Sequence, residues 1–146
     1  MVRGRWFDRH ELQAMMEEPV QGYKRIEQMD SAFQVAVEKN GTLDAISEFK
    51  IHAKPGDKLS ESLVNALGYR MVNAHQFEAA IALFAFDTEQ YPNSWNAYDS
   101  LGEAYADSGQ SDLATVSYRH SLALNPRNTG AFEFLSKAAM PPTASK

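Results

Sequence analysis

Three stretches of the sequence come close to known catalytic motifs, and each lacks a residue that its chemistry requires. The string from His10 to Ala14 begins like the zinc-protease motif but ends in alanine where the second histidine ligand belongs. Ser47 and Lys50 have the spacing of a serine nucleophile and a lysine base, but no Lys-Thr-Gly string follows. The string from Tyr98 to Gly102 lacks the first glycine of a nucleophile elbow. The sequence therefore predicts no catalytic residue and a chain that is not an enzyme.

Metal and cofactor chemistry find little support in the composition. The chain contains no cysteine, which excludes disulfides, thiolate catalysis and cysteine-based metal sites. Its four histidines are scattered, and no two of them lie four residues apart on a helix: His10, His52, His75 and His120. We predict neither a metal nor a cofactor.

The stretch from residue 61 to residue 128 contains the same helical hairpin twice. Each unit reads as an amphipathic helix, a short polar break and a second amphipathic helix that ends at a proline. One constant interval, which we call the repeat interval, separates every residue of the first unit from its counterpart in the second. The matching positions are Leu67-Gly68 and Leu101-Gly102, Ala80 and Ala114, and Pro92 and Pro126.

Glycine inside a helix costs roughly 1 kcal/mol relative to alanine, so Gly68 and Gly102 need a packing reason. We expect the second helix of each unit to approach closely there, with the small Ala80 or Ala114 at the crossing. The repeat interval and the pattern resemble the tetratricopeptide repeat, or TPR. That resemblance implies hairpins that stack on one another, because one unit cannot bury its apolar face alone.

The predicted fold is all-α: a short α-solenoid of two TPR-like hairpins and a capping helix, preceded by two or three helices. Residues 1–59 form the N-terminal helical segment, in which Glu18-Pro19 is expected to end a first helix. The repeats span 60–139, as units 60–93 and 94–127 with a capping helix over 129–139. A disordered tail is expected over 140–146.

The charge pattern narrows the choice of partner. The net charge is −5, and the repeat region carries all of it, because residues 60–139 contain roughly twice as many acids as bases. An acidic region of this kind argues against nucleic acid and against anionic membrane surfaces. The longest apolar run is too short for the ~20 residues that span a bilayer. Taken as a complete chain, the sequence predicts a cytoplasmic protein.

The TPR resemblance implies a binding surface on the concave face, which the first helices of the units build. Helical spacing predicts that eight residues form this groove: Ser62, Asn65, Tyr69, Asn73, Asn96, Asp99, Glu103 and Asp107. Glu133 and Lys137 would continue the row. The groove has no basic clamp for an acidic peptide, so we expect a protein or peptide partner with basic residues.

Two other functions stay open. The chain could be a self-association module that forms a homo-oligomer through exposed apolar ends or through Trp6 and Phe7. The string from Ser94 to Tyr105 also resembles the tail that follows many bacterial serine hydrolases, such as α/β-hydrolase esterases and β-lactamase-like enzymes. That resemblance implies an accessory tail whose catalytic domain is absent from this chain.

Overall fold

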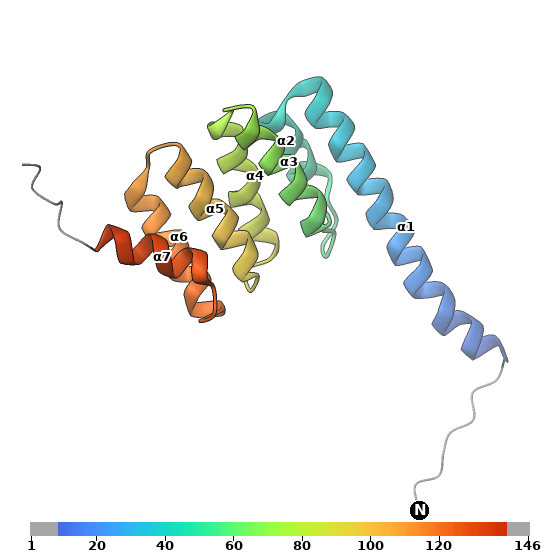
Figure 1. The fold of residues 1–146 in the computed structure, drawn as a ribbon. Helices are drawn as coiled ribbons and strands as arrows, with labels where there is room; N and C mark the ends of the chain where they lie inside the picture. Colours follow the sequence, from blue (N-terminus) through green and yellow to red (C-terminus); the bar gives the residue numbers. More distant parts are fainter. Residues whose placement is uncertain (1–8, 140–146) are drawn as a thin grey trace, which may run out of the picture.

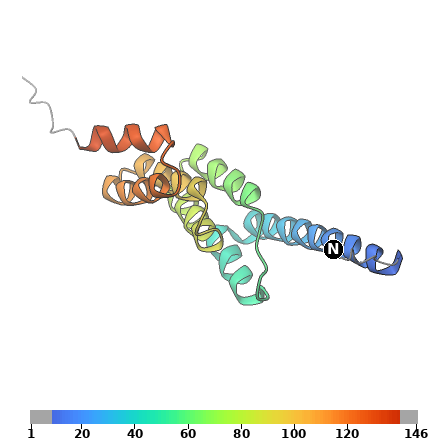
Figure 2. The same cartoon turned by 90° about the horizontal axis from the view of Figure 1, so that it is seen from below.

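The computed structural model describes residues 9–139, except for the side chains of residues 10–16 and 18. These residues form seven α-helices and no β-strand, so the all-α prediction is confirmed. The helices stack side by side along one direction, and the N-terminal part of α1 projects away from the stack (Figures 1 and 2). Their bounds are α1 Arg9–Asn40, α2 Thr42–His52, α3 Glu61–Asn73, α4 Phe77–Gln90, α5 Trp95–Asp107, α6 Ser111–Leu124 and α7 Thr129–Ala138.

A polar side chain caps the start of α3, α5 and α7 in the same way. The hydroxyl oxygens of Ser60 and Ser94 accept hydrogen bonds from backbone N–H groups three residues later, each at 3.3 Å. Asn128 does the same for α7 with its amide oxygen, at 3.2 Å. Such caps satisfy N–H groups that have no partner inside the helix. The three caps follow one another at the repeat interval, so each unit begins with the same local structure.

A residue with positive φ lies between the two helices of each hairpin, and these residues again follow one another at the repeat interval. Gly41 has φ 87° between α1 and α2, His75 has φ 56° between α3 and α4, and Gly109 has φ 79° between α5 and α6. Glycine adopts this region without steric cost, whereas His75 adopts it under the constraint of the turn. The C-terminal half of α1 and α2 thus form an additional hairpin with a positive-φ residue at the matching position, although its connection is shorter, and sequence analysis did not recognise it.

The predicted helix break at Glu18-Pro19 is wrong. Residues 9–40 form one continuous helix, α1, with Pro19 inside it. The proline ring fixes φ near the helical value and removes one backbone donor, so a helix can continue on both sides of it at a cost. The chain therefore has two helices before the predicted repeats, and the first of them is 32 residues long.

The packing of Gly68 and Gly102 corrects the expected reason for these glycines. A Cβ atom on Gly68 would lie 2.4 Å from two ring carbons of Phe84, and one on Gly102 would lie 3.0 Å from the ring of Tyr118. Ala80 is fully buried, as expected. The space at each glycine is nevertheless filled by an aromatic ring from the second helix of the hairpin, not by the predicted alanine.

The core consists of three clusters along the stack. Three phenylalanines join α1, α2 and α4: the ring centres of Phe33 and Phe49 are 6.0 Å apart, and those of Phe49 and Phe86 are 5.6 Å apart. A middle cluster surrounds Phe84 between α4 and α5. At the C-terminal end Tyr118 packs against Phe134 of α7, with ring centres 4.6 Å apart. α7 thereby covers an apolar edge of α6, as the capping-helix prediction expects.

Candidate interaction surface

The eight predicted groove residues lie on α3 and α5, the first helices of the two predicted hairpins. Ser62 and Asn73 are exposed on α3, and Asp107 is exposed on α5. The other five are partly buried: Asn65, Tyr69, Asn96, Asp99 and Glu103. Partial burial shows that several of these side chains contact neighbouring helices, so their contacts decide what remains for a ligand.

A hydrogen-bonded chain joins α3 to α5 through three of the predicted residues. The hydroxyl of Tyr69 donates to Glu103 Oε2 at 2.7 Å and lies 3.2 Å from Ser100 Oγ. Ser100 Oγ in turn donates to Asn65 Oδ1 at 2.9 Å. Burial is the main cause that raises the pKa of Tyr69 to about 12, so its phenol keeps its proton and acts as the donor. Tyr69 therefore holds Glu103 in place, and Asn65 binds Ser100 beside it.

Asp99 is tied to the start of α7. Its Oδ1 accepts a hydrogen bond from Asn128 Nδ2 at 2.6 Å. The same amide group lies 2.8 Å from Ser121 Oγ, and Asn128 is 8% exposed. Sequence analysis missed Asn128, although an asparagine directly before an apolar helix is a recognisable N-cap signal.

The three acids of α5 all affect the pKa of the same side chain, Tyr118 of α6. Asp99, Glu103 and Asp107 all help to raise the pKa of Tyr118 above its ordinary value, after burial as the largest cause. Ion pairs between described side chains lie at Arg25–Asp57, Lys50–Glu89 and Arg70–Glu38, away from these acids. We call Asp99, Glu103 and Asp107 the carboxylate row.

The two near-catalytic strings whose side chains the structure describes do not assemble into a site, and the side chains of the zinc-protease-like string, residues 10–14, lie outside the described part. Ser100 is buried inside α5 and serves the Tyr69–Asn65 network, as described above. His120 stacks on Tyr98 with ring centres 3.8 Å apart. Ser47 is exposed on α2, and Lys50 pairs with Glu89 at 2.5 Å. Among the described residues no group of three His, Asp or Glu side chains could hold a metal ion, and no helix is long and apolar enough to cross a membrane.

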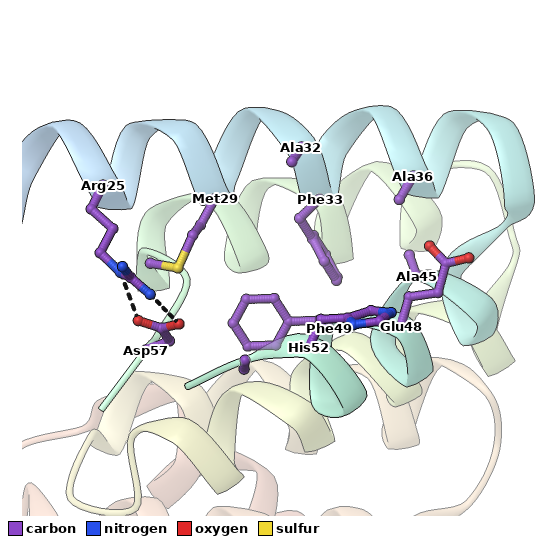
Figure 3. Close-up of a pocket in the computed structure, with 11 residues that line it drawn as sticks. Arg25, Met29, Ala32, Phe33, Ala36, Ala45, Glu48, Phe49, His52 and Asp57 are labelled. Carbon is purple, nitrogen blue, oxygen red and sulfur yellow. Dashed lines mark hydrogen bonds and ion pairs between the residues drawn. The ribbon is translucent and has the colours of Figure 1, made fainter. Parts of the chain in front are cut away.

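A cavity of about 320 Å³ lies between α1 and α2 (Figure 3). Apolar side chains form most of its wall, among them Met29, Phe33 and Phe49. At one end Arg25 donates two hydrogen bonds to the carboxylate of Asp57, at 2.8 and 2.7 Å. These bonds hold the pKa of Asp57 below its ordinary value. No pattern in the sequence predicted this cavity, because it depends on how α1 crosses α2.

Comparisons with known proteins support the fold. No protein-family model matches the chain, and no curated protein matches it either. Solved structures do match. A crystal structure of MamA is 17% identical with a TM-score of 0.55, over 92% of this chain and 84% of that chain. A mutant form of MamA is also 17% identical, with a TM-score of 0.56, over 77% of this chain and 82% of that chain.

At this level of identity the likeness concerns the fold alone. It agrees with the TPR-like helical repeat that the sequence predicts, since MamA is a TPR-containing protein. The resemblance to serine-hydrolase tails has no counterpart among these structures and stays a prediction of the sequence.

Proposed function

We propose that the chain is a non-catalytic protein-interaction module that binds a lysine- or arginine-rich segment of a partner along the carboxylate row. The single observation that carries this proposal is the row itself: three carboxylates on one helix, with no cationic partner among the side chains that the structure describes. Carboxylates that no cation neutralises leave a local negative potential, and this potential favours a cationic ligand.

The spacing of the row suggests how such a segment would lie. Asp99, Glu103 and Asp107 are four residues apart, so they share one face of α5 and rise by about 6 Å at each step. Alternate side chains of an extended chain are about 6.5 Å apart on one side. An extended segment with a basic residue at every second position therefore matches the row.

The contacts divide the predicted groove residues into two roles. Tyr69 positions Glu103, and Asn65 is engaged with Ser100 between α3 and α5. Ser62 and Asn73 stay exposed and would offer neutral hydrogen bonds beside the row. This division supports a groove whose charged contacts come mainly from α5.

A binding measurement with defined peptides tests the proposal. Two fluorescent peptides of identical composition carry three lysines, at every second or at every fourth position, and fluorescence anisotropy reports their affinity. We expect the first peptide to bind more tightly and to lose affinity as salt rises, because salt screens exposed charges. Tighter binding of the second peptide would favour a helical segment instead, and no binding of either would contradict the proposal.

Two charge reversals sharpen this test. Asp107→Lys changes the exposed end of the row and leaves the hydrogen bonds of Asp99 and Glu103 intact. Asp112→Lys makes the same change at an exposed acid of α6 and serves as the control. We expect about a tenfold loss of affinity in the first variant, equivalent to ~1.4 kcal/mol, and little change in the second. Equal losses in both would show attraction to net charge alone.

Self-association is a second candidate, and the projecting part of α1 favours it. Three apolar side chains on this part are unusually exposed: Val20 at 51%, Tyr23 at 72% and Ile26 at 38%. A helix face of this kind gains free energy when a second copy covers it. Light scattering over a concentration series should show a dimer or larger species that Tyr23→Glu weakens. A monomer at every concentration would exclude this function.

A further inference from the structure

Asp87 is a buried carboxyl group without a hydrogen-bond partner among the described residues. It lies on α4, is 0% exposed, and neither of its oxygens has a hydrogen-bond partner among the described residues. Taking an ionised carboxylate out of water without a partner is costly enough that such groups usually become neutral instead. The protonation state of Asp87 therefore needs an explanation.

The groups around Asp87 do not supply a counter-charge. Glu61 of α3 acts on it with the same sign of charge, and Asp30 of α1 bonds to Ser60 just before α3. Lys58 lies in the segment before α3, and its Nζ donates to the carbonyl of Gln90 at 2.6 Å.

The remaining neighbours are neutral or engaged elsewhere. Tyr91 donates its phenol proton to the carbonyl of Leu59 at 2.5 Å. Lys50 of α2 is paired with Glu89 on α4. Ser94 at the start of α5 donates to Glu61 Oε1 at 2.5 Å, and no ionisable side chain of α5 acts on Asp87.

The second hairpin shows what this position does when it carries a hydroxyl. Ser121 is the counterpart of Asp87 at the repeat interval, and its Oγ donates to the backbone carbonyl of Trp95 at 2.9 Å. Trp95 is the first residue of α5, and its counterpart Glu61 is the first residue of α3. In the first hairpin the carbonyl of Glu61 therefore corresponds to the acceptor that Ser121 uses. A carboxylate cannot donate to it, whereas a carboxylic acid can.

We propose that Asp87 is a neutral carboxylic acid that donates its proton to the backbone carbonyl of Glu61, and that loss of this proton loosens the junction of α3 and α4. The acid thus replaces the hydroxyl of Ser121 in the repeat. Unlike that hydroxyl, it can be switched off by a change of pH. The inference concerns the fold and does not depend on peptide binding.

The sign of the pH effect follows from linkage. Burial, and to a lesser degree Glu61, raises the pKa of Asp87 from its usual 3.8 to about 7. Between these two values the folded chain holds a proton that the unfolded chain has released. The stability contributed by the neutral acid is therefore full below pH ~4 and is lost as the pH rises to ~7. A shift of roughly three units corresponds to as much as a thousandfold change in the unfolding equilibrium.

The direct test is a carbon-13 titration of the aspartate carboxyl groups in the full chain. We expect the Asp87 signal to move near pH 7, and in Glu61→Gln at a somewhat lower pH, because burial remains the larger cause. A titration near the ordinary value of an aspartate, about 3.8, would overturn the proposal. The titration of the unmodified protein decides this point by itself and does not depend on the folding of Glu61→Gln.

Denaturation at several pH values provides the second test. We expect the unfolding midpoint of the unmodified chain to fall between pH 4 and 7, and Asp87→Ser, which copies the second hairpin, should lose this fall. Asp87→Asn removes the ionisation with little change in shape and should do the same. Asp44→Ser, at an exposed acid of α2, is the matched control and should keep the fall. The inference would be contradicted if the unfolding midpoints of both Asp87 variants fell as much between pH 4 and 7 as that of the unmodified chain.

Discussion

The aromatic ring over Gly68 leads to a strong test of the packing. In Gly68→Ala the added Cβ would lie 2.4 Å from Cε1 and Cζ of Phe84, so the ring or the helix must move. Phe84 is 0% exposed, and its ring packs edge-on against Tyr69 with centres 5.3 Å apart. The ring therefore has little room to move away.

The expected magnitude comes from two opposing effects. Overpacking a filled core costs typically 1–3 kcal/mol, and the short distance at Gly68 favours the upper part of that range. Replacing a helical glycine by alanine gains roughly 1 kcal/mol. We therefore expect Gly68→Ala to lower the free energy of unfolding by about 1–2 kcal/mol.

Two other glycines provide graded controls within the same chain. In Gly102→Ala the nearest ring atoms of Tyr118 lie at 3.0 Å, so a small shift suffices and the two effects should nearly cancel. In Gly22→Ala no atom lies within 4 Å of the new Cβ, so only the gain of roughly 1 kcal/mol remains. The predicted order of stability is thus Gly22→Ala, then the unmodified chain and Gly102→Ala, then Gly68→Ala.

Urea denaturation followed by circular dichroism measures this order through the unfolding midpoints. A double-mutant cycle with Phe84→Leu then tests the cause, because removing the outer ring atoms should reduce the cost of Gly68→Ala. The reasoning would be refuted if Gly68→Ala were as stable as Gly22→Ala. It would also fail if the cost of Gly68→Ala were the same with Phe84 and with leucine.

Two further substitutions test contacts at the ends of the stack. Asn128→Ala removes the cap of α7 and the donor to Asp99, and should cost about 2 kcal/mol in the free energy of unfolding, measured by urea denaturation; a loss below about 0.5 kcal/mol would contradict this. Arg25→Ala breaks an exposed ion pair with Asp57 and should leave the thermal midpoint nearly unchanged, since such pairs are screened by solvent. A large fall in that midpoint would show that α1 depends on this pair.

The repeat could be predicted from the sequence because its signals are local. A capping serine, a helical glycine and a terminating proline act on residues within one or two turns, and all of them recur at the repeat interval. The helix starts after Ser60 and Ser94 and the capping role of α7 follow from such signals. The row of acids on α5 could likewise be placed on one face from the helical period alone.

Other features depend on distances between helices, which no local pattern contains. α1 continues through Pro19 although the dipeptide with Glu18 favours a break. Which side chain fills the space at Gly68 is decided by how α4 crosses α3, and the answer is Phe84. Asp87 reads in the sequence as one more surface acid of an acidic repeat, yet packing removes it completely from water. The sequence by itself determined the helices of the two predicted hairpins and their interval, whereas only the tertiary structure decided which polar groups are buried, because burial depends on neighbours far apart in the chain.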